Sequence, residues 1–427
     1  MRVWWIIGLC VVSTVSSMMP REAQGAESVR SYDLLRVLEL ALERNPLMDG
    51  AQSVIDQSVG RRIAAGAYPN PTISGNGGHG MLRDAGVTAT SAIDVPMRER
   101  LTEYNASVGQ PLEWPSKRQA RQQAAEAGLA GATVGLVETR LNLAADVKIV
   151  FYELLLAQRN LELAKQNLDI VEDVRRIVNT RVRLGEAPQF ELIKAEVEVL
   201  KAQQIVTRIA NRVRVNRVVL DTLTAGALGS DYAIEGDFQI FWKDLTFEPL
   251  VVRALEQHPT LQRLVTSIEQ ADRNVEFERQ ARVPNVTVNA AYWREIGREA
   301  FTAGVSVPTP IWYRQQGQIA GALGVKRGEE AQLLRQRNVL IQEVNQHFKD
   351  AETTAHLIDV FQKGLLKQAQ EALRIAQFSF RQGAASLLEV LDAQRVQQQI
   401  LFDYTQARFD LSVALTRLER AVGGPLL

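Results

Sequence analysis

The sequence contains a single cysteine, Cys10, and only four histidines. Cys10 lies in the apolar N-terminal segment, so a mature chain without that segment would hold no disulfide. The histidines His79, His258, His347 and His356 stand at no metal-ligand spacing from one another. No nucleophilic side chain has a recognisable base partner. We therefore expect no metal, no cofactor and no catalytic residues, and the sequence gives an enzymatic function no positive support.

The chain also lacks net charge, because Lys+Arg and Asp+Glu each number 49. It has no basic excess that would favour nucleic acid or a polybasic attachment to a membrane surface. Beyond the N-terminus it has no apolar run of the ~20 residues that a spanning helix requires. Insertion into a membrane would therefore have to come from strands.

The N-terminal segment has the pattern of a secretory signal. Arg2 is followed by an apolar run over residues 3–15, and small residues surround a cleavage site at 23–25. We expect residues 1–25 to be a signal peptide that directs export. An uncleaved membrane anchor remains an alternative, although the run is short for one. Lipidation of Cys10 is another, although Leu9 is not the small residue expected before a lipidated cysteine.

The rest of the chain reads as two similar halves. Val37–Pro46 and Leu250–Pro259 share an Ala-Leu-Glu core and end in proline. After each copy come a second helical pattern, two alternating segments and two long heptad-patterned stretches, which meet at Gly185 or at Gly383. The period is far longer than that of a solenoid repeat. We predict a first repeat over 26–228, an irregular linker or belt over 229–247, and a second repeat over 248–427.

The helical patterns are of two lengths. Short helices are expected at 31–45 and 47–67, whereas the pattern after Pro115 continues to about Arg183, on the order of 100 Å of helix. Apolar residues step by three and four along each long stretch, as in coiled coils. These seams are Val147, Val150, Leu154, Ala157, Leu161, Ala164, Leu168 and Val171; Leu192, Ala195, Val199, Ala202, Val206, Ile209 and Val213; Ile341, Val344, Phe348, Ala351, Ala355 and Ile358; and Leu401, Tyr404, Ala407, Leu411, Ala414 and Leu418.

Each half also contains two segments of alternating polarity, near 72–80 and 104–109 in the first half and near 285–292 and 301–307 in the second. Their length, roughly 9 to 11 residues, suits tilted strands that cross a bilayer. A half-buried soluble sheet would give a similar pattern, but the export signal and the long helices that follow favour a membrane barrel. Four strands cannot close a barrel, and three copies would supply twelve strands and twelve long helices.

Together these features resemble the TolC family of outer-membrane efflux proteins over essentially the whole mature chain. Val307–Gly317 is similar to the proline-rich strand exit of the heavy-metal branch, the CzcC-like and CusC-like channels, although that branch often has asparagine in place of Tyr313. The resemblance implies a mainly α fold with a small β part. It also implies a trimer that forms a 12-stranded outer-membrane β-barrel and a periplasmic α-helical barrel.

The resemblance further implies a passive exit duct of a tripartite efflux system in the outer membrane of a Gram-negative bacterium. Its partners would be a periplasmic adaptor, an inner-membrane pump of the RND type and outer-membrane lipid, and its cargo heavy-metal cations. Export of drugs or polypeptides through the same architecture remains an alternative. A soluble periplasmic coiled-coil scaffold or adaptor is a further one.

Glu389 and Asp392 are the candidate gate residues. They are three residues apart, so they share a helix face soon after Gly383. The matching place in the family holds acidic residues around the periplasmic entrance, where a trimer would present six carboxylates. The alternative is a solvated helix face without such a role. Glu191 and Lys194 occupy the equivalent offsets in the first half, where opposite charges could pair.

Two further groups of candidate residues follow from the resemblance and from the expected strand ends. The helix turns are predicted adaptor contacts, although a helix hairpin needs a left-handed residue whether or not a partner exists. They comprise Arg183, Leu184 and Gly185 in the first half and Arg381, Gln382 and Gly383 in the second. Aromatic residues at strand ends suit the headgroup level of a membrane, with core packing as the alternative; they are Trp114, Tyr292, Trp293, Trp312 and Tyr313.

Overall fold

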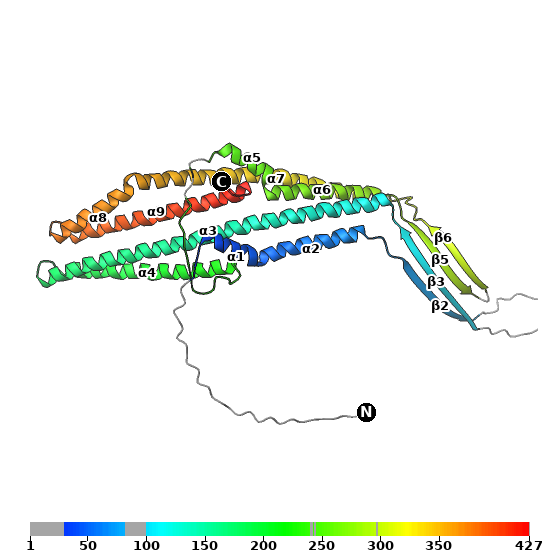
Figure 1. Ribbon diagram of the computed structural model, residues 1–427, viewed down its shortest axis with the longest axis horizontal. Coiled ribbons are helices and arrows are strands. Elements are labelled where there is room, and N and C mark those ends of the chain that lie inside the picture. Colours follow the sequence, from blue (N-terminus) through cyan, green and yellow to red (C-terminus); the bar gives the residue numbers. More distant parts are fainter. Residues whose placement is uncertain (1–29, 82–99, 240–241, 243–244, 296–297, 427) are drawn as a thin grey trace, which may run out of the picture.

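The computed structural model describes residues 30–81, 100–239, 242, 245–295 and 298–426. The predicted signal peptide, with Cys10, lies outside the described residues. The chain is an elongated bundle of helices that ends in a β-sheet, and two helix hairpins form the opposite end (Figure 1). The mainly α fold with a small β part is as predicted.

The same order of elements occurs twice. In the first half it comprises α1 (Leu34–Arg44), α2 (Pro46–Gly66), β2 (Thr72–Met81), β3 (Arg100–Leu112), α3 (Pro115–Arg183) and α4 (Gln189–Leu223). In the second half it comprises α5 (Phe247–Gln257), α6 (Pro259–Gln280), β5 (Val286–Glu295), β6 (Arg298–Ser306), α7 (Gln316–Val360), a π-helical turn (Phe361–Leu365), α8 (Leu366–Arg381) and α9 (Leu387–Val422). All four predicted strands are present. The division at 26–228, 229–247 and 248–427 is the one we propose for the repeats.

The short helices and the link between the halves differ from expectation at one place. Residues predicted to begin the first helix instead form β1 (Arg30–Tyr32), which pairs in parallel with β4 (Tyr232–Ile234) inside the predicted irregular belt. Tyr232 is fully buried, and its hydroxyl donates to the carbonyl oxygen of Arg217 at 2.7 Å. The helix α1 starts only after Asp33, whose side chain accepts from the backbone N–H of Arg36.

The long helices bury the predicted seams. α3 extends over 69 residues, and Val147 and Leu154 on its seam are fully buried. The expectation for Ile341 is wrong, because its side chain is 38% exposed while that of Leu340 is 1% exposed. A helix with 3.6 residues per turn drifts from a strict heptad. The seam of α7 therefore enters the core one residue earlier than the sequence pattern indicated.

The sheet has the strand order β2-β3-β5-β6, with every pair antiparallel. One face carries mostly apolar residues, since Val108 lies opposite Ala290 and Val288 lies opposite Val305. The other face carries mostly small polar residues, since Ser74 lies opposite Ser107, and their hydroxyls are 2.7 Å apart. The sheet is open, with β2 at one edge and β6 at the other.

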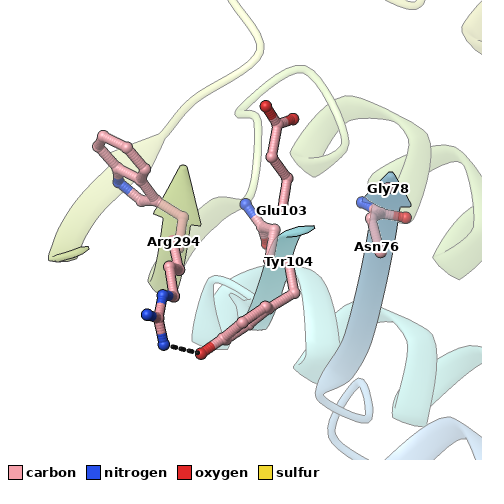
Figure 2. A pocket seen from close by; sticks show the side chains of 8 residues that line it. Asn76, Gly78, Glu103, Tyr104 and Arg294 are labelled. Atoms are coloured by element: carbon pink, nitrogen blue, oxygen red, sulfur yellow. Dashed lines mark hydrogen bonds between the residues drawn. The ribbon is translucent and has the colours of Figure 1, made fainter. Parts of the chain in front are cut away.

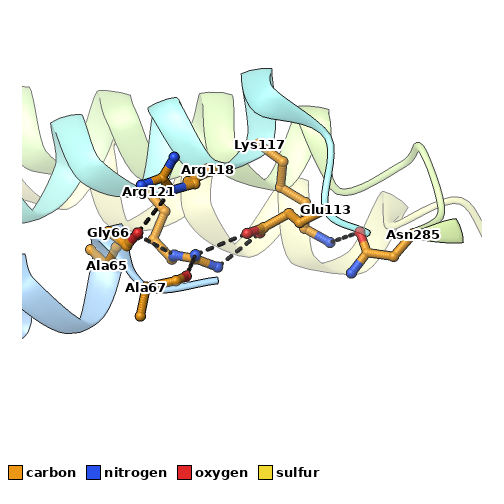
Figure 3. Close-up of polar contacts among 8 residues, drawn as sticks. All are labelled: Ala65, Gly66, Ala67, Glu113, Lys117, Arg118, Arg121 and Asn285. Carbon is orange, nitrogen blue, oxygen red and sulfur yellow. Dashed lines mark hydrogen bonds and ion pairs between the residues drawn. The ribbon is translucent and has the colours of Figure 1, made fainter. Parts of the chain in front are cut away.

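A partly buried ion pair ties the sheet to the helices at their junction (Figure 3). The guanidinium of Arg121 binds both carboxylate oxygens of Glu113 at 2.8 and 2.9 Å, and the Glu113 side chain is almost fully buried. The same guanidinium donates to the carbonyl oxygens of Ala65 and Ala67 at the end of α2. Helix ends leave such carbonyls without intrahelical partners. The first turns of α3 are thereby tied to α2 and to the end of β3.

Candidate functional site

Two helix turns lie side by side at the end of the bundle opposite the sheet (Figure 1). Gly185 and Gly383 have φ of 78° and 76°, in the left-handed region that favours glycine. Each turn closes with the same pair of backbone hydrogen bonds, which in the second turn run from Gly383 to Phe380 and from Ala384 to Ser379. The predicted positions of both turns are confirmed, and the flanking Arg183, Leu184, Arg381 and Gln382 are all exposed.

A small core joins the two hairpins, α3–α4 and α8–α9, directly behind their turns. The first hairpin supplies Val178 and Ala195, and the second supplies Phe380 and Val390, all buried. The guanidinium of Arg181 lies over the ring of Phe380 at 5.2 Å. The hairpins therefore pack on each other as well as within themselves, and separating the tips would expose this core.

A cavity of 470 Å³ opens between the two turns. It brings together four of the six predicted adaptor-contact residues, Leu184, Arg381, Gln382 and Gly383. Arg183 and Gly185 do not line it. The remaining lining residues come from the first hairpin; they are Arg176, Ile177, Thr180, Arg181 and Glu186. The cavity is mainly basic in its charged groups, a property that the glycine pattern alone did not indicate.

Glu389 has a local role that the sequence interpretation missed. Its carboxylate accepts from the backbone N–H of Ser386 at 2.7 Å, while Ser386 Oγ accepts from the N–H of Glu389 at 3.3 Å. This reciprocal pair is a capping box at the start of α9. The signal was available in the sequence as serine followed three residues later by glutamate.

Asp392 is exposed one turn further along α9. Within the part of the chain that the structure describes, its carboxylate takes part in no hydrogen bond or ion pair. Asp392 and Glu389 thus lie close together on the helix but differ in what holds them: one carboxylate is engaged by the cap and the other faces solvent.

The aromatic candidates occupy two different levels of the sheet. Trp114 is the N-cap residue of α3, and its indole N–H donates to the carbonyl oxygen of Pro284 at 2.8 Å. Trp312 is 90% exposed and, with the exposed Tyr313, lies between β6 and α7 at the helix end of the sheet. Tyr292 and Trp293 lie toward the far end of β5.

The strand register separates Tyr292 from Trp293. Tyr292 lies opposite Phe301 on the apolar face, whereas Trp293 lies opposite Asn105 on the polar face. Neighbouring residues in a strand point to opposite faces, so the two rings cannot both face lipid. The role of Tyr292 and Trp293 as aromatics at the membrane interface stays a prediction. Phe301, which is largely exposed beside Tyr292, is a further aromatic residue on the apolar face that the sequence analysis did not name.

A cavity of 440 Å³ lies at the far end of the sheet (Figure 2). Asn76, Glu103, Asn105 and Trp293 contribute to its lining from the polar face. Tyr104 lies on the other side of the sheet, where its hydroxyl accepts from the guanidinium of Arg294 at 3.3 Å. Tyr104 and Arg294 also line the cavity, so residues of both faces contribute to it.

Metal-binding geometry is not found in the described ranges, where no group of three or more His, Cys, Asp or Glu residues could hold an ion. Within the same ranges no helix combines the length and apolarity needed to cross a membrane. The charged residues in the middle of the bundle instead form structural pairs. Lys148 Nζ of α3 lies 2.5 Å from Glu419 Oε2 of α9, which joins the two halves. Burial, aided by the nearby Glu419 carboxylate, raises the pKa of Tyr152 to about 12.

Long helices with paired tips, continued by an open sheet with one polar and one apolar face, define the fold of an outer-membrane efflux channel. The family model described as outer membrane efflux protein matches residues 37–226 and 250–424. The chain belongs to this family, and its place is the outer membrane of a Gram-negative bacterium, with a large helical part in the periplasm. The predicted family, fold class and localisation are confirmed.

Two curated relatives and one solved structure illustrate the similarity. The chain is 24% identical to the cobalt-zinc-cadmium resistance protein CzcC of Cupriavidus metallidurans, over 95% of this chain and 92% of that protein. It is 23% identical to the pyoverdine export outer membrane protein OpmQ of Pseudomonas aeruginosa, over 92% and 85% of the two chains. A crystal structure of CusC superposes with a TM-score of 0.76 at 15% identity, over 92% of each chain.

Proposed function

We propose that this protein is the passive exit duct of a tripartite efflux system and that its cargo is divalent heavy-metal cations. The likeness to a cobalt-zinc-cadmium resistance protein over nearly the full length of both chains is the observation that carries this proposal. The neutral polar groups on the inner face of the sheet suit hydrated cations, which need a wet passage rather than a binding site. Energy would come from an inner-membrane pump of the RND type, joined through a periplasmic adaptor.

The assembly we propose is a homotrimer. In lipid, unpaired backbone groups at an open sheet edge cost several kcal/mol each, so β2 and β6 each need a partner strand. Pairing β6 of one copy with β2 of the next closes the ring, and three copies give an even-numbered barrel of normal size. Two copies would give eight strands and an interior filled by side chains.

The orientation of the sheet can be tested with two neighbouring substitutions in β5. Val288→Asp places a charge on the apolar face, and Asn289→Asp places it on the polar face. We expect the Val288 variant to be depleted from the outer-membrane fraction, because a charge that faces lipid destabilises a barrel, for Asp by less than the roughly 2–4 kcal/mol of Arg or Lys at the bilayer midplane. The Asn289 variant should remain. Equal loss or equal retention would contradict the proposed lipid and water faces.

At the tips we propose that the helix turns contact the adaptor and that Glu389 and Asp392 restrain the periplasmic entrance. Both turns are exposed and have a basic cavity between them, which supports their contact with a partner. The core that the two hairpins share behind the turns is small, so a partner could separate them. Chemical crosslinking from cysteines at Leu184 or Gln382 to the adaptor should succeed. Crosslinking from a cysteine at Trp312, at the sheet end of the chain, should not.

The cargo is tested in a strain that lacks the gene. We expect greater sensitivity to Co²⁺, Zn²⁺ and Cd²⁺, restored by the wild-type gene and by Asn289→Asp but not by Val288→Asp. The second candidate cargo is an organic chelator of the siderophore class, favoured by the likeness to a pyoverdine export protein. Unchanged metal sensitivity together with retained siderophore inside the cell would favour that candidate over the first.

A further inference from the structure

Each half of the chain contains a joint where its second short helix begins beside the end of its return helix. In the first half, Asn45 precedes Pro46 at the start of α2. Its Oδ1 accepts from the backbone N–H of Leu47 at 2.9 Å, and its Nδ2 donates to the carbonyl oxygen of Leu223, the last residue of α4, at 2.8 Å. The Asn45 side chain is buried, with 5% exposed. One amide group therefore caps one helix and holds the end of another.

In the second half the same position is a histidine. His258 precedes Pro259 at the start of α6, and its Nδ1 accepts from the backbone N–H of Thr260 at 3.2 Å. Its Nε2 lies 3.1 Å from the carbonyl oxygen of Arg420, in the last turn of α9. The residue is 8% exposed. The imidazole repeats both tasks of the asparagine amide, but unlike the amide it can be protonated near neutral pH.

The two hydrogen bonds define one protonation state. A carbonyl oxygen can only accept, so Nε2 carries the hydrogen, and Nδ1 must be bare to accept from Thr260. Protonation would convert Nδ1 into a donor that faces another donor. It would also place a positive charge at the N-terminus of α6, where the helix dipole favours negative charge. The interaction with Arg420 would survive, because Nε2 is a donor in both states.

Charged groups around the ring come from several helices. Burial lowers the pKa of His258, while the Arg420 carbonyl and the carboxylates of Glu138 on α3 and Glu343 on α7 act in the opposite direction. Glu138 is already engaged by Arg263 Nε at 2.6 Å and by the Thr260 hydroxyl at 2.8 Å. The net effect is a lowered pKa, so the buried site favours the neutral ring.

The basic groups of the neighbouring helices do not bind the ring. The guanidinium of Arg420 on α9 is directed to Asp146 on α3, at 3.6 Å. From α5, Arg253 lies against Gly424, where a Cβ atom would be 3.3 Å from its Nη2. The chain is also tight here, since a Cβ on Gly423 would lie 3.0 Å from the Cα of His258. A protonated ring would find little space in which to turn and recover a partner.

We propose that His258 makes the joint between α6 and the end of α9 sensitive to mild acid, whereas Asn45 holds the matching joint between α2 and α4 at any pH. Well above about pH 6.5 the ring is neutral whether the two hydrogen bonds of the joint are intact (closed) or broken (open), so pH has little effect there. As the pH falls through this value, the open joint binds a proton that the closed joint resists. The closed joint therefore loses stability with falling pH. Acid would loosen the anchor of the α8–α9 hairpin and leave that of the α3–α4 hairpin intact.

Hydrogen–deuterium exchange of the intact protein in detergent, at pH 7.5 and 5.5 and corrected for the intrinsic rates, tests this proposal. At pH 5.5 we expect faster exchange at the start of α6 and in the last turn of α9. The increase should be at most about tenfold, because pH 5.5 lies one unit below the ordinary pKa of histidine. The start of α2 and the end of α4 should not change. A wild-type protein whose two joints respond alike would overturn the proposal without any variant.

Reciprocal substitutions sharpen the test. His258→Asn copies the first joint into the second and should abolish the acid response at α6, while Asn45→His should transfer a response to α2. His356→Asn, an exposed histidine on α7, serves as the matched control and should leave the wild-type response unchanged. An acid response at α6 that persists in the His258→Asn protein would assign it to another group and overturn the proposal.

Discussion

Glu389 allows the charge of the proposed entrance to be separated from the helix cap that the same side chain forms. Glu389→Ala removes the charge and also the acceptor of the Ser386 N–H, which lies at 2.7 Å. Glu389→Gln removes only the charge, because glutamine can close a capping box. Asp392→Asn removes a charge that the described structure does not use in any cap. The three variants therefore distinguish two explanations of how the periplasmic entrance is kept closed, namely the carboxylate charge and the helix cap.

The expected stabilities follow from the contacts. Glu389→Ala keeps the hydrogen bond from its own backbone N–H to Ser386 Oγ and loses only the one from the Ser386 N–H, which costs about 0.5–1.5 kcal/mol. Loss of a negative charge in the first turn costs about 0.3–1 kcal/mol more. Glu389→Ala should therefore lower the stability of the tip by about 1–2.5 kcal/mol per subunit, and Glu389→Gln by less than about 1 kcal/mol. Exchange rates of the amides at the start of α9 would measure this difference directly.

Conductance in planar bilayers decides between charge and cap. If carboxylates restrain the entrance, Glu389→Gln and Asp392→Asn should both raise the conductance and reduce its preference for cations, and high salt should have the same effect on the wild type. Opening by Glu389→Ala alone, with both charge-only variants unchanged, would refute the charge argument. The cap would then be the element that keeps the tip closed.

Three further predictions concern stability, each measured by thermal or denaturant unfolding of the purified protein. Glu419→Gln should destabilise by about 2–3 kcal/mol, because it leaves Lys148 partly buried beside an uncharged partner, whereas the double change to Glu419→Leu and Lys148→Leu should cost less than the single one. Gly423→Ala should cost at least about 1–2 kcal/mol, since its φ of 89° and the nearby Cα of His258 both disfavour a Cβ atom. Leu340→Ala should cost about 2–5 kcal/mol of stability and Ile341→Ala much less. A larger loss for Ile341→Ala than for Leu340→Ala would instead support Ile341 as the core residue, as the heptad pattern predicted.

The sequence predicted the elements whose signal is local and repeated. The span of α3 follows from an apolar period of three to four residues that repeats along the helix. The turns follow from Gly185 and Gly383, since glycine tolerates positive φ. Both signals involve only residues that are close together in the sequence. The pairing of Arg30–Tyr32 with Tyr232–Ile234 could not be predicted in this way. Three residues have no period, and their partner lies far along the chain, in the belt between the two repeats.

The sequence predicted where the helix turns and the strand ends lie, but not how the candidate residues are held there. Trp293 was assigned with Tyr292 because both stand near a strand end, and only the register shows that they face opposite sides. His258 was considered only as a metal ligand, although the following proline marks it as a helix cap. The charge pattern gave Glu389 a role in the entrance, and its bond to Ser386 became evident only when the helix start was placed.

The strand order β2-β3-β5-β6 has a consequence for ancestry. Within one chain, the last strand of the first half pairs with the first strand of the second half, as β3 does with β5. Around a closed ring, β6 would meet the next β2 in the same relation. Every strand pair that joins one half to the next then consists of equivalent strands, so six copies of a single half could build the same cylinder. Duplication and fusion of such a half-length precursor would halve the number of subunits and free the two halves to diverge, as Asn45 and His258 have done.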